Sequence, residues 1–136
     1  MRWMWRGHRF WWRISGGRIG ASVAGLPVLE LITTGHATGR PRLVLLNYAV
    51  HPRGYVVVAS NGGSDAPPAW WRNLQTHPAA EVHRAGMKER VAAGALEGED
   101  RDGAWATFAG TNPAYARYEA ATERRIAVVL LERATS

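Results

Sequence analysis

The chain of 136 residues contains no cysteine, and this absence excludes several kinds of chemistry at once. Without thiols there is no disulfide framework, no thiolate metal site and no cysteine nucleophile. The five histidines show neither HExxH nor HxH spacing, so the sequence predicts no metal centre. A GxSxG nucleophile elbow and a Walker GKS/T loop are also missing, which leaves a serine hydrolase and a P-loop nucleotidase without support.

Long apolar runs are absent as well. No stretch approaches the roughly 20 apolar residues that a membrane-spanning helix needs, and the N-terminus lacks the uninterrupted apolar core of a cleavable signal. We therefore expect a cytoplasmic protein. Its length predicts one folded domain, and its 46% hydrophobic and 21% charged residues are typical of a globular chain.

The net charge of +6 is concentrated at the N-terminus. Residues 1–18 hold five of the 17 basic residues and no acid, so 12 basic residues face 11 acidic ones in the remainder. A body with so little net charge offers no basic face, and we expect no nucleic-acid partner. The composition predicts two parts, a basic aromatic arm over 1–18 and a folded domain over 19–136.

The arginines of the arm recur at helical spacing. Arg2, Arg6, Arg9 and Arg13 fall within a stripe about 60° wide on a helix, and aromatic and aliphatic side chains cover most of the rest. This pattern is typical of a helix that lies in a membrane interface, which predicts contact between residues 2–14 and the inner face of the cell membrane. Alternatively, the same aromatics cap the folded domain while the arginines face solvent. Both interpretations stay open.

The remainder of the chain predicts a mainly β domain. We expect strands over 28–34, 43–50, 55–60, 79–84, 87–97 and 126–131, and helices over 68–76, 100–110 and 113–122. Val56, Val57 and Val58 are apolar on both faces of their strand, which indicates a central position. Because the strands do not alternate regularly with helices, the expected fold is α+β, mainly β: a small antiparallel barrel with peripheral helices and an N-terminal helical arm.

Two loops have compositions suited to anionic groups. The loop over 33–42 combines glycines, which allow close approach of the backbone, with two arginines that can bind phosphate through a planar fork. The loop over 59–64 carries a glycine pair and leads to a helix N-terminus, where a flat ring or a phosphate could lie against the backbone. Ordinary connections between strands have similar compositions, so each signal alone leaves both interpretations open.

A third candidate is a pair of tyrosines. Tyr115 and Tyr118 are three residues apart and share one face of the expected helix. A phenol can donate a hydrogen bond to a developing oxyanion or stack on a planar substrate. Packing within the core is the alternative role for such a pair.

Taken together, three ordered blocks resemble the deazaflavin-dependent nitroreductase family. The blocks are LITTGHATGRPRLVLLNY, YVVVASNGGSDAPPAWWRNLQTHP and NPAYARYEAATERRIAVVLL, within about Leu29 to Leu131. The resemblance implies a split β-barrel similar to FMN-binding barrels. It also implies the deazaflavin coenzyme F420, whose tail carries a phosphate and oligoglutamate, and hydride transfer to a quinone or nitro acceptor.

The same resemblance implies roles for individual residues. Ser60 and Tyr115 would lie over the deazaflavin ring as the catalytic pair, and Tyr115 and Tyr118 would contact the substrate. The implied cofactor-binding residues are Thr38, Gly39, Arg40, Pro41, Arg42, Ser60, Asn61, Gly62, Gly63 and Trp70.

The chain departs from the family pattern at several positions. His36 and Ala37 stand where the phosphate loop usually has basic residues, Ala66 replaces a frequent lysine, and Asn112 replaces a tyrosine. These departures keep two alternatives open. One is a non-catalytic barrel that binds a lipid or fatty acid in its cleft, and the other is a reductase that uses FMN instead of F420.

Overall fold

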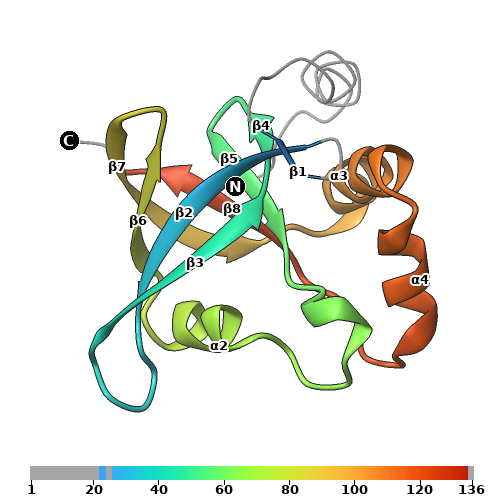
Figure 1. The fold of residues 1–136 in the computed structure, drawn as a ribbon, viewed down its shortest axis with the longest axis horizontal. Helices are drawn as coiled ribbons and strands as arrows, with labels where there is room; N and C mark the ends of the chain where they lie inside the picture. The colour runs from blue at the N-terminus through green and yellow to red at the C-terminus, as the bar shows by residue number, and fades with distance from the viewer. Residues whose placement is uncertain (1–21, 24–25, 135–136) are drawn as a thin grey trace.

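A single curled antiparallel sheet forms the body of the molecule, in a computed structural model that describes residues 22–23 and 26–134 (Figure 1). Its strands are β1 (Ser22–Val23), β2 (Leu26–Thr34), β3 (Pro41–Asn47), β4 (Ala49–His51), β5 (Gly54–Val58), β6 (Ala79–Arg84), β7 (Met87–Ala95) and β8 (Val128–Arg133). The helices are the 3-10 turn η1 (Asn61–Gly63), α2 (Ala69–Thr76), α3 (Gly98–Thr111) and α4 (Ala114–Ala121).

The sheet closes into a barrel because one extended segment changes its partner. The strand order is β1-β2-β6-β7-β8-β5-β4, and β3 pairs with the other edge of β2. Only Tyr48 separates β3 from β4, so the chain leaves β2 and joins β5 within two residues. The buried Tyr48 marks this corner, where its backbone N–H donates to the carbonyl of Pro27 at 3.0 Å.

The expected antiparallel barrel with peripheral helices is confirmed, with corrections to individual elements. The single strand expected over 43–50 is wrong, since it is divided at Tyr48, and β1 adds a short strand that the sequence pattern did not indicate. The described residues therefore form eight strands instead of six. The last strand is displaced by two residues, to Val128–Arg133, and α3 begins two residues earlier than expected. Apolar residues lie on both sides of Tyr48 although β3 is mostly exposed, so hydrophobic patterning does not mark the corner where the partner strand changes.

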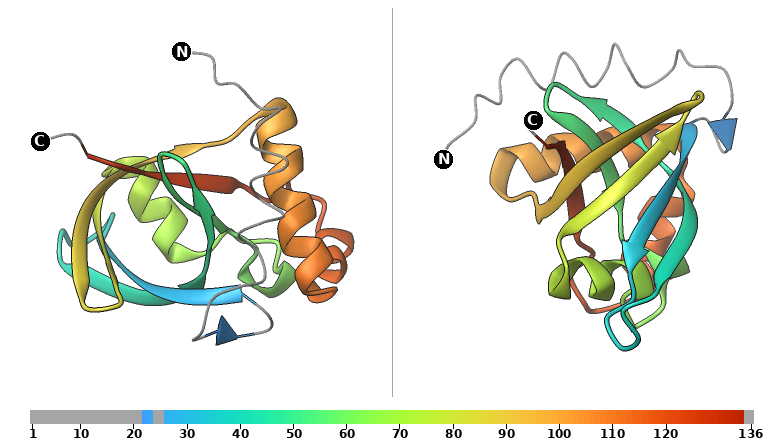
Figure 2. Two further views of the ribbon diagram at one scale, coloured as in Figure 1. Left: turned by 90° about the horizontal axis from the view of Figure 1, so that it is seen from above. Right: turned by 90° about the vertical axis from the view of Figure 1, so that its left-hand side faces the viewer.

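Two hydrophobic cores lie on opposite faces of β5 and β8. Tyr55 and Val57 face the barrel interior and pack with Leu74 of α2, whereas Val56 and Val58 face the layer formed by α3 and α4. Figure 2 shows these two helices side by side against one flank of the barrel. All five residues of β5 are buried, which confirms the central position expected for this strand.

The α3–α4 layer corresponds to the two helices expected over 100–110 and 113–122. Phe108 is fully buried, and Trp105 and Ala109 pack against the same core. The side chain of Asn112 accepts a hydrogen bond from the backbone N–H of Ala114 at 3.0 Å, and so caps the start of α4. These contacts attach the segment that carries Tyr115 and Tyr118 to the outside of the barrel.

The arm predicted over 1–18 lies outside the described residues. Within residues 22–23 and 26–134, no helix has the length and apolar character needed to cross a bilayer.

Gly54 begins β5 at a point where the backbone leaves no room for a side chain. Its φ is +153°, and a Cβ atom there would lie 2.0 Å from the carbonyl oxygen of Leu131 on β8. We expect Gly54→Ala to lower the free energy of unfolding by about 3 kcal/mol or more, because two paired strands would have to separate. Gly86→Ala is the control: it has φ +76° but no atom within 4 Å, so only the backbone strain of about 1 kcal/mol applies. Equal losses in chemical denaturation would contradict this packing.

Candidate functional site

A cavity of about 460 Å³ opens between the β2–β3 loop and the start of α2. It brings together three residues that the sequence singled out, Thr38, Arg42 and Trp70, from three separate elements of the chain. Gly39 and Arg40 of the same loop, and Pro41 at the start of β3, are not part of the lining among the described residues. The lining residues are Thr33, Gly35, His36, Ala37, Thr38, Arg42, Leu43, Val44, Ala69, Trp70 and Asn73.

The β2–β3 loop is closed by its own backbone. The N–H of Gly35 donates to the carbonyl of Arg40, and the N–H of Gly39 donates to the carbonyl of Gly35, both at 2.8 Å. Thr38 accepts a further hydrogen bond from the N–H of Arg40 at 3.2 Å through its hydroxyl oxygen. A Cβ atom at Gly35 would lie 2.9 Å from that hydroxyl oxygen, so the loop leaves no room for a side chain at this position.

The side chain of Asn73 in α2 holds this loop in place through hydrogen bonds. Its side chain is 3% exposed, and Oδ1 accepts hydrogen bonds from the backbone N–H of His36 at 2.8 Å and from the His36 ring Nδ1 at 2.7 Å. Its Nδ2 donates to the hydroxyl of Thr33 at 2.9 Å. Because Oδ1 is an acceptor, Nδ1 of His36 carries a proton. The buried amide of Asn73 therefore forms hydrogen bonds with three groups, two on His36 and one on Thr33, and holds the loop that lines the cavity.

The second glycine turn lies at the same end of the barrel, on the other side of α2 (Figure 1). Ser60, Asn61, Gly62 and Gly63 are not part of the cavity lining among the described residues. At Gly63 a Cβ atom would lie 3.0 Å from the Cα of Tyr118, so this glycine allows α4 to approach closely. Gly62 faces open space. The two glycines therefore have different surroundings, and only Gly62 could lie against a ligand.

The two tyrosines lie in the α3–α4 layer, outside the cavity lining. The ring of Tyr115 makes edge-to-face contacts with Phe108 at 5.3 Å and with Tyr118 at 5.6 Å, and only 7% of the residue is exposed. Burial raises the pKa of its phenol to about 12, and Tyr118 adds to this shift. Its hydroxyl has no hydrogen-bond partner among the described residues.

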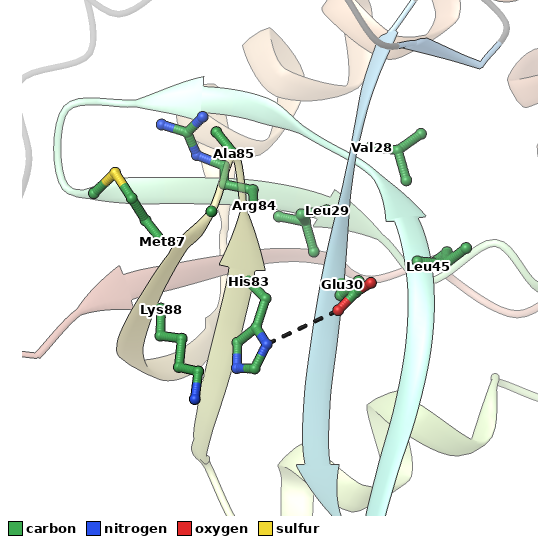
Figure 3. A pocket seen from close by; sticks show the side chains of 10 residues that line it. Val28, Leu29, Glu30, Leu45, His83, Arg84, Ala85, Met87 and Lys88 are labelled. Carbon is green, nitrogen blue, oxygen red and sulfur yellow. Dashed lines mark ion pairs between the residues drawn. The ribbon is translucent and has the colours of Figure 1, made fainter.

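A second cavity, of about 480 Å³, lies where β2 and the β6–β7 hairpin diverge (Figure 3). His83 lies 3.9 Å from a carboxylate oxygen of Glu30 across this opening. The cationic side chains of Arg84 and Lys88 extend in opposite directions, so they do not converge on one anion. The cavity beside α2 has the more focused set of polar groups, and we take it as the candidate site. No group of three or more potential metal ligands occurs within residues 22–23 and 26–134.

Sequence reasoning missed Asn73 and Arg124, the two side chains that hold the glycine turns in place. Asn73 gave a signal, since it lies three residues after Trp70 and one before Leu74, on the apolar face of its helix. A polar residue on a buried face must find partners, and these partners form the loop. Arg124 gave none, because its acceptors are backbone carbonyls some 60 residues earlier in the chain.

We predict that Asn73→Ala lowers the free energy of unfolding by about 1–3 kcal/mol, because it leaves the loop groups of Thr33 and His36 without their partner. Gln75→Ala, an exposed position on the same helix, is the control and should change stability by less than about 0.5 kcal/mol. Urea denaturation measures both values. A loss at Asn73 no larger than that at Gln75 would show that the clamp is not needed for folding.

Comparison with solved structures first defines the class of the fold. The heme storage protein of Vibrio cholerae shares the architecture with a TM-score of 0.58 at 14% identity, over 80% of this chain and 82% of that chain. A solved F420-H2 dependent reductase aligns with a TM-score of 0.69 at 34% identity, over 78% of this chain and 94% of that chain. The molecule is therefore a split β-barrel, as the sequence led us to expect.

Sequence comparison then identifies the family. The family model described as F420H(2)-dependent quinone reductase matches residues 3–133. The F420H(2)-dependent quinone reductase of Mycobacterium tuberculosis is 36% identical over 126 residues, which cover 90% of this chain and 85% of that protein. The chain belongs to the F420H(2)-dependent quinone reductase family, and the resemblance to deazaflavin-dependent reductases is confirmed.

Proposed function

We propose that this chain is an oxidoreductase that uses reduced F420 to reduce a quinone. The main structural support is the cavity beside α2, where the Asn73-clamped loop brings Thr38 and Arg42 next to Trp70. Membership of a family named for this activity supports the same function.

The residues present fit the proposed cofactor. F420 has an anionic tail and a flat ring, and the lining of the cavity includes Arg42 and Thr38, which can bind an anion, and the indole of Trp70. Arg40 lies on the same exposed loop and adds positive charge near the rim. These groups compensate for the uncharged Ala37 at a position where the family often has a basic residue.

The protein would supply orientation and polarity to the reaction. When bound, the cofactor supplies the hydride, while the chain binds its tail and holds the ring against the acceptor. We propose that Tyr115 donates a hydrogen bond to the acceptor oxygen as negative charge develops there, and that Ser60 lies near the ring. A phenol with a pKa of about 12 keeps its proton at neutral pH, which suits a hydrogen-bond donor and not a base.

The acceptor is proposed to be a lipophilic quinone, with nitro compounds as a second class. Tyr118 packs against Tyr115 and is only partly buried, so its ring is available to cover a planar substrate. The natural location would then be the cytoplasm, with peripheral contact at the inner face of the membrane through residues 2–14.

Titration of the purified full chain with oxidised and reduced F420 tests the proposal. We expect binding at micromolar cofactor, and oxidation of the reduced form when a soluble quinone is added. Absence of binding would refute it. The small molecules that co-purify then decide between the alternatives: flavin absorbance indicates an FMN enzyme, and a lipid detected by mass spectrometry indicates a non-catalytic binder.

We predict that Tyr115→Phe lowers turnover by roughly ten- to a hundredfold but changes the F420 dissociation constant by less than about threefold. Since the phenol stays protonated, the ratio of variant to wild-type rate should be constant over roughly pH 6 to 9. Tyr118→Phe is the control: it keeps the ring that would cover the substrate, so turnover and the KM for the acceptor should each change by less than about threefold. A parallel loss of affinity and turnover in Tyr115→Phe would assign this ring to the binding wall alone.

We also predict that removal of residues 1–14 abolishes sedimentation with anionic vesicles, because the arginines and aromatic residues of this segment suit a lipid interface. Reduction of a water-soluble quinone should persist, because none of the described residues that line the cavity is removed. Vesicle binding that survives the truncation would locate the membrane contact elsewhere.

A further inference from the structure

Arg124, in the connection between α4 and β8, holds both ends of the second glycine turn. Its Nε donates to the carbonyl of Ser64 at 2.9 Å, Nη1 to that of Ala59 at 3.2 Å, and Nη2 to that of Ser60 at 3.0 Å. Three hydrogen bonds from one rigid, charged fork to three carbonyls fix the turn more firmly than separate neutral contacts would.

Further contacts tie the same turn to the chain around Arg124. The hydroxyl of Thr122 donates to Asp65 at 2.9 Å, and the N–H of Ala59 donates to the carbonyl of Ala127 at 2.9 Å. Gly63 packs directly against the backbone of Tyr118. The turn and the helix that carries the two tyrosines therefore form one connected unit, with Arg124 as its charged centre.

This arrangement orients two N–H groups. The described peptide bonds are all trans, so the N–H of a peptide points opposite to its carbonyl. Because the carbonyls of Ala59 and Ser60 point to Arg124, the N–H groups of Ser60 and Asn61 point away from it. Neither N–H has a backbone acceptor among the described residues.

The local backbone also favours an electronegative ligand. Ser60 has right-handed dihedrals, with φ −78° and ψ −33°, and the next two residues, Asn61 and Gly62, have φ of +48° and +64°. Such a change of hand turns successive N–H groups toward one side, where they can share an oxygen atom. The side that they face is the one that Arg124 leaves free.

We propose that Arg124 is a positioning residue for cofactor binding: it holds the turn so that the N–H groups of Ser60 and Asn61 can bind a carbonyl or phosphate oxygen of F420. Arg124 acts through the turn and does not contact the cofactor itself. The cofactor part of this inference rests on the proposed function, whereas the orientation of the turn can be tested without any ligand.

The neighbouring Arg125 provides a matched control. Its side chain is 65% exposed, and among the described residues it forms an ion pair with Glu97 at 3.3 Å. We expect Arg124→Ala to raise the F420 dissociation constant about tenfold or more, which corresponds to about 1.4 kcal/mol. Arg125→Ala should stay within about twofold of the wild type. Equal dissociation constants for the two variants would overturn the proposal.

Two further measurements distinguish a positioning role of Arg124 from a merely structural one. Methylguanidinium at millimolar concentration should restore F420 affinity in Arg124→Ala but not change Arg125→Ala, since only the first variant has lost a guanidinium from a built site. Arg124→Lys should give intermediate affinity, because an ammonium group cannot reach three carbonyls in a fixed fork. If Arg124→Ala loses thermal stability but gains nothing from methylguanidinium, and Arg124→Lys binds like the wild type, the positioning role is refuted.

Amide hydrogen exchange separates the role of Arg124 in ordering the turn from the proposed binding of F420. In Arg124→Ala, the N–H groups of Gly63 and Ser64, which bond to Ser60 and Asn61 within the turn, should exchange faster than in Arg125→Ala without any ligand present. If this difference appears while the wild type fails to bind F420, the proposed function is wrong and the role of Arg124 in ordering the turn stands. Equal exchange in the two variants would overturn that role.

Discussion

Burial of β5 and β8 on both faces is the constraint on which the rest of the structure depends. The two strands pair through Val57 and Val129 toward the barrel interior and through Val56 and Leu130 toward the helices. Because neither face meets water, the barrel and the α3–α4 layer must fold onto one shared wall. The second glycine turn leaves the end of β5, and Arg124 precedes the start of β8, so this wall also determines where both sides of their contact lie.

The sequence predicted those parts of the fold in which burial and periodicity agree. The valines of β5, the apolar run before Leu131 and the helix beginning near Pro68 each gave a local pattern strong enough to identify the element. It did not predict the division of one strand at Tyr48, because apolar residues lie on both sides of this corner and give one continuous pattern. The sequence predicted residues of the candidate site, since Thr38, Arg42 and Trp70 all line the cavity. It did not predict the side chains that hold the turns. The hydrogen bonds of Asn73 and Arg124 span 37 to 65 residues of sequence, and no local pattern reveals them.

The glycines of the two turns look alike in the sequence, but the structure requires them for different reasons. Gly35 is enclosed by its own loop, Gly63 admits the backbone of α4, and Gly62 faces open space. All three contribute to one end of the barrel, but only the first lines the cavity among the described residues. Binding of the proposed cofactor would give these turns a common role. They lie on either side of α2 in the view of Figure 1, and each has its own side-chain clamp.

The hydrogen bond between Asn73 and the ring of His36 has a chemical consequence for the loop. With a proton held on Nδ1, the neutral imidazole presents only a lone pair at Nε2, and a phosphate oxygen would meet another acceptor there. The ring nitrogen that faces the amide is therefore unavailable to an anion, and the donors that remain on the lining of the cavity are the guanidinium of Arg42 and the hydroxyl of Thr38.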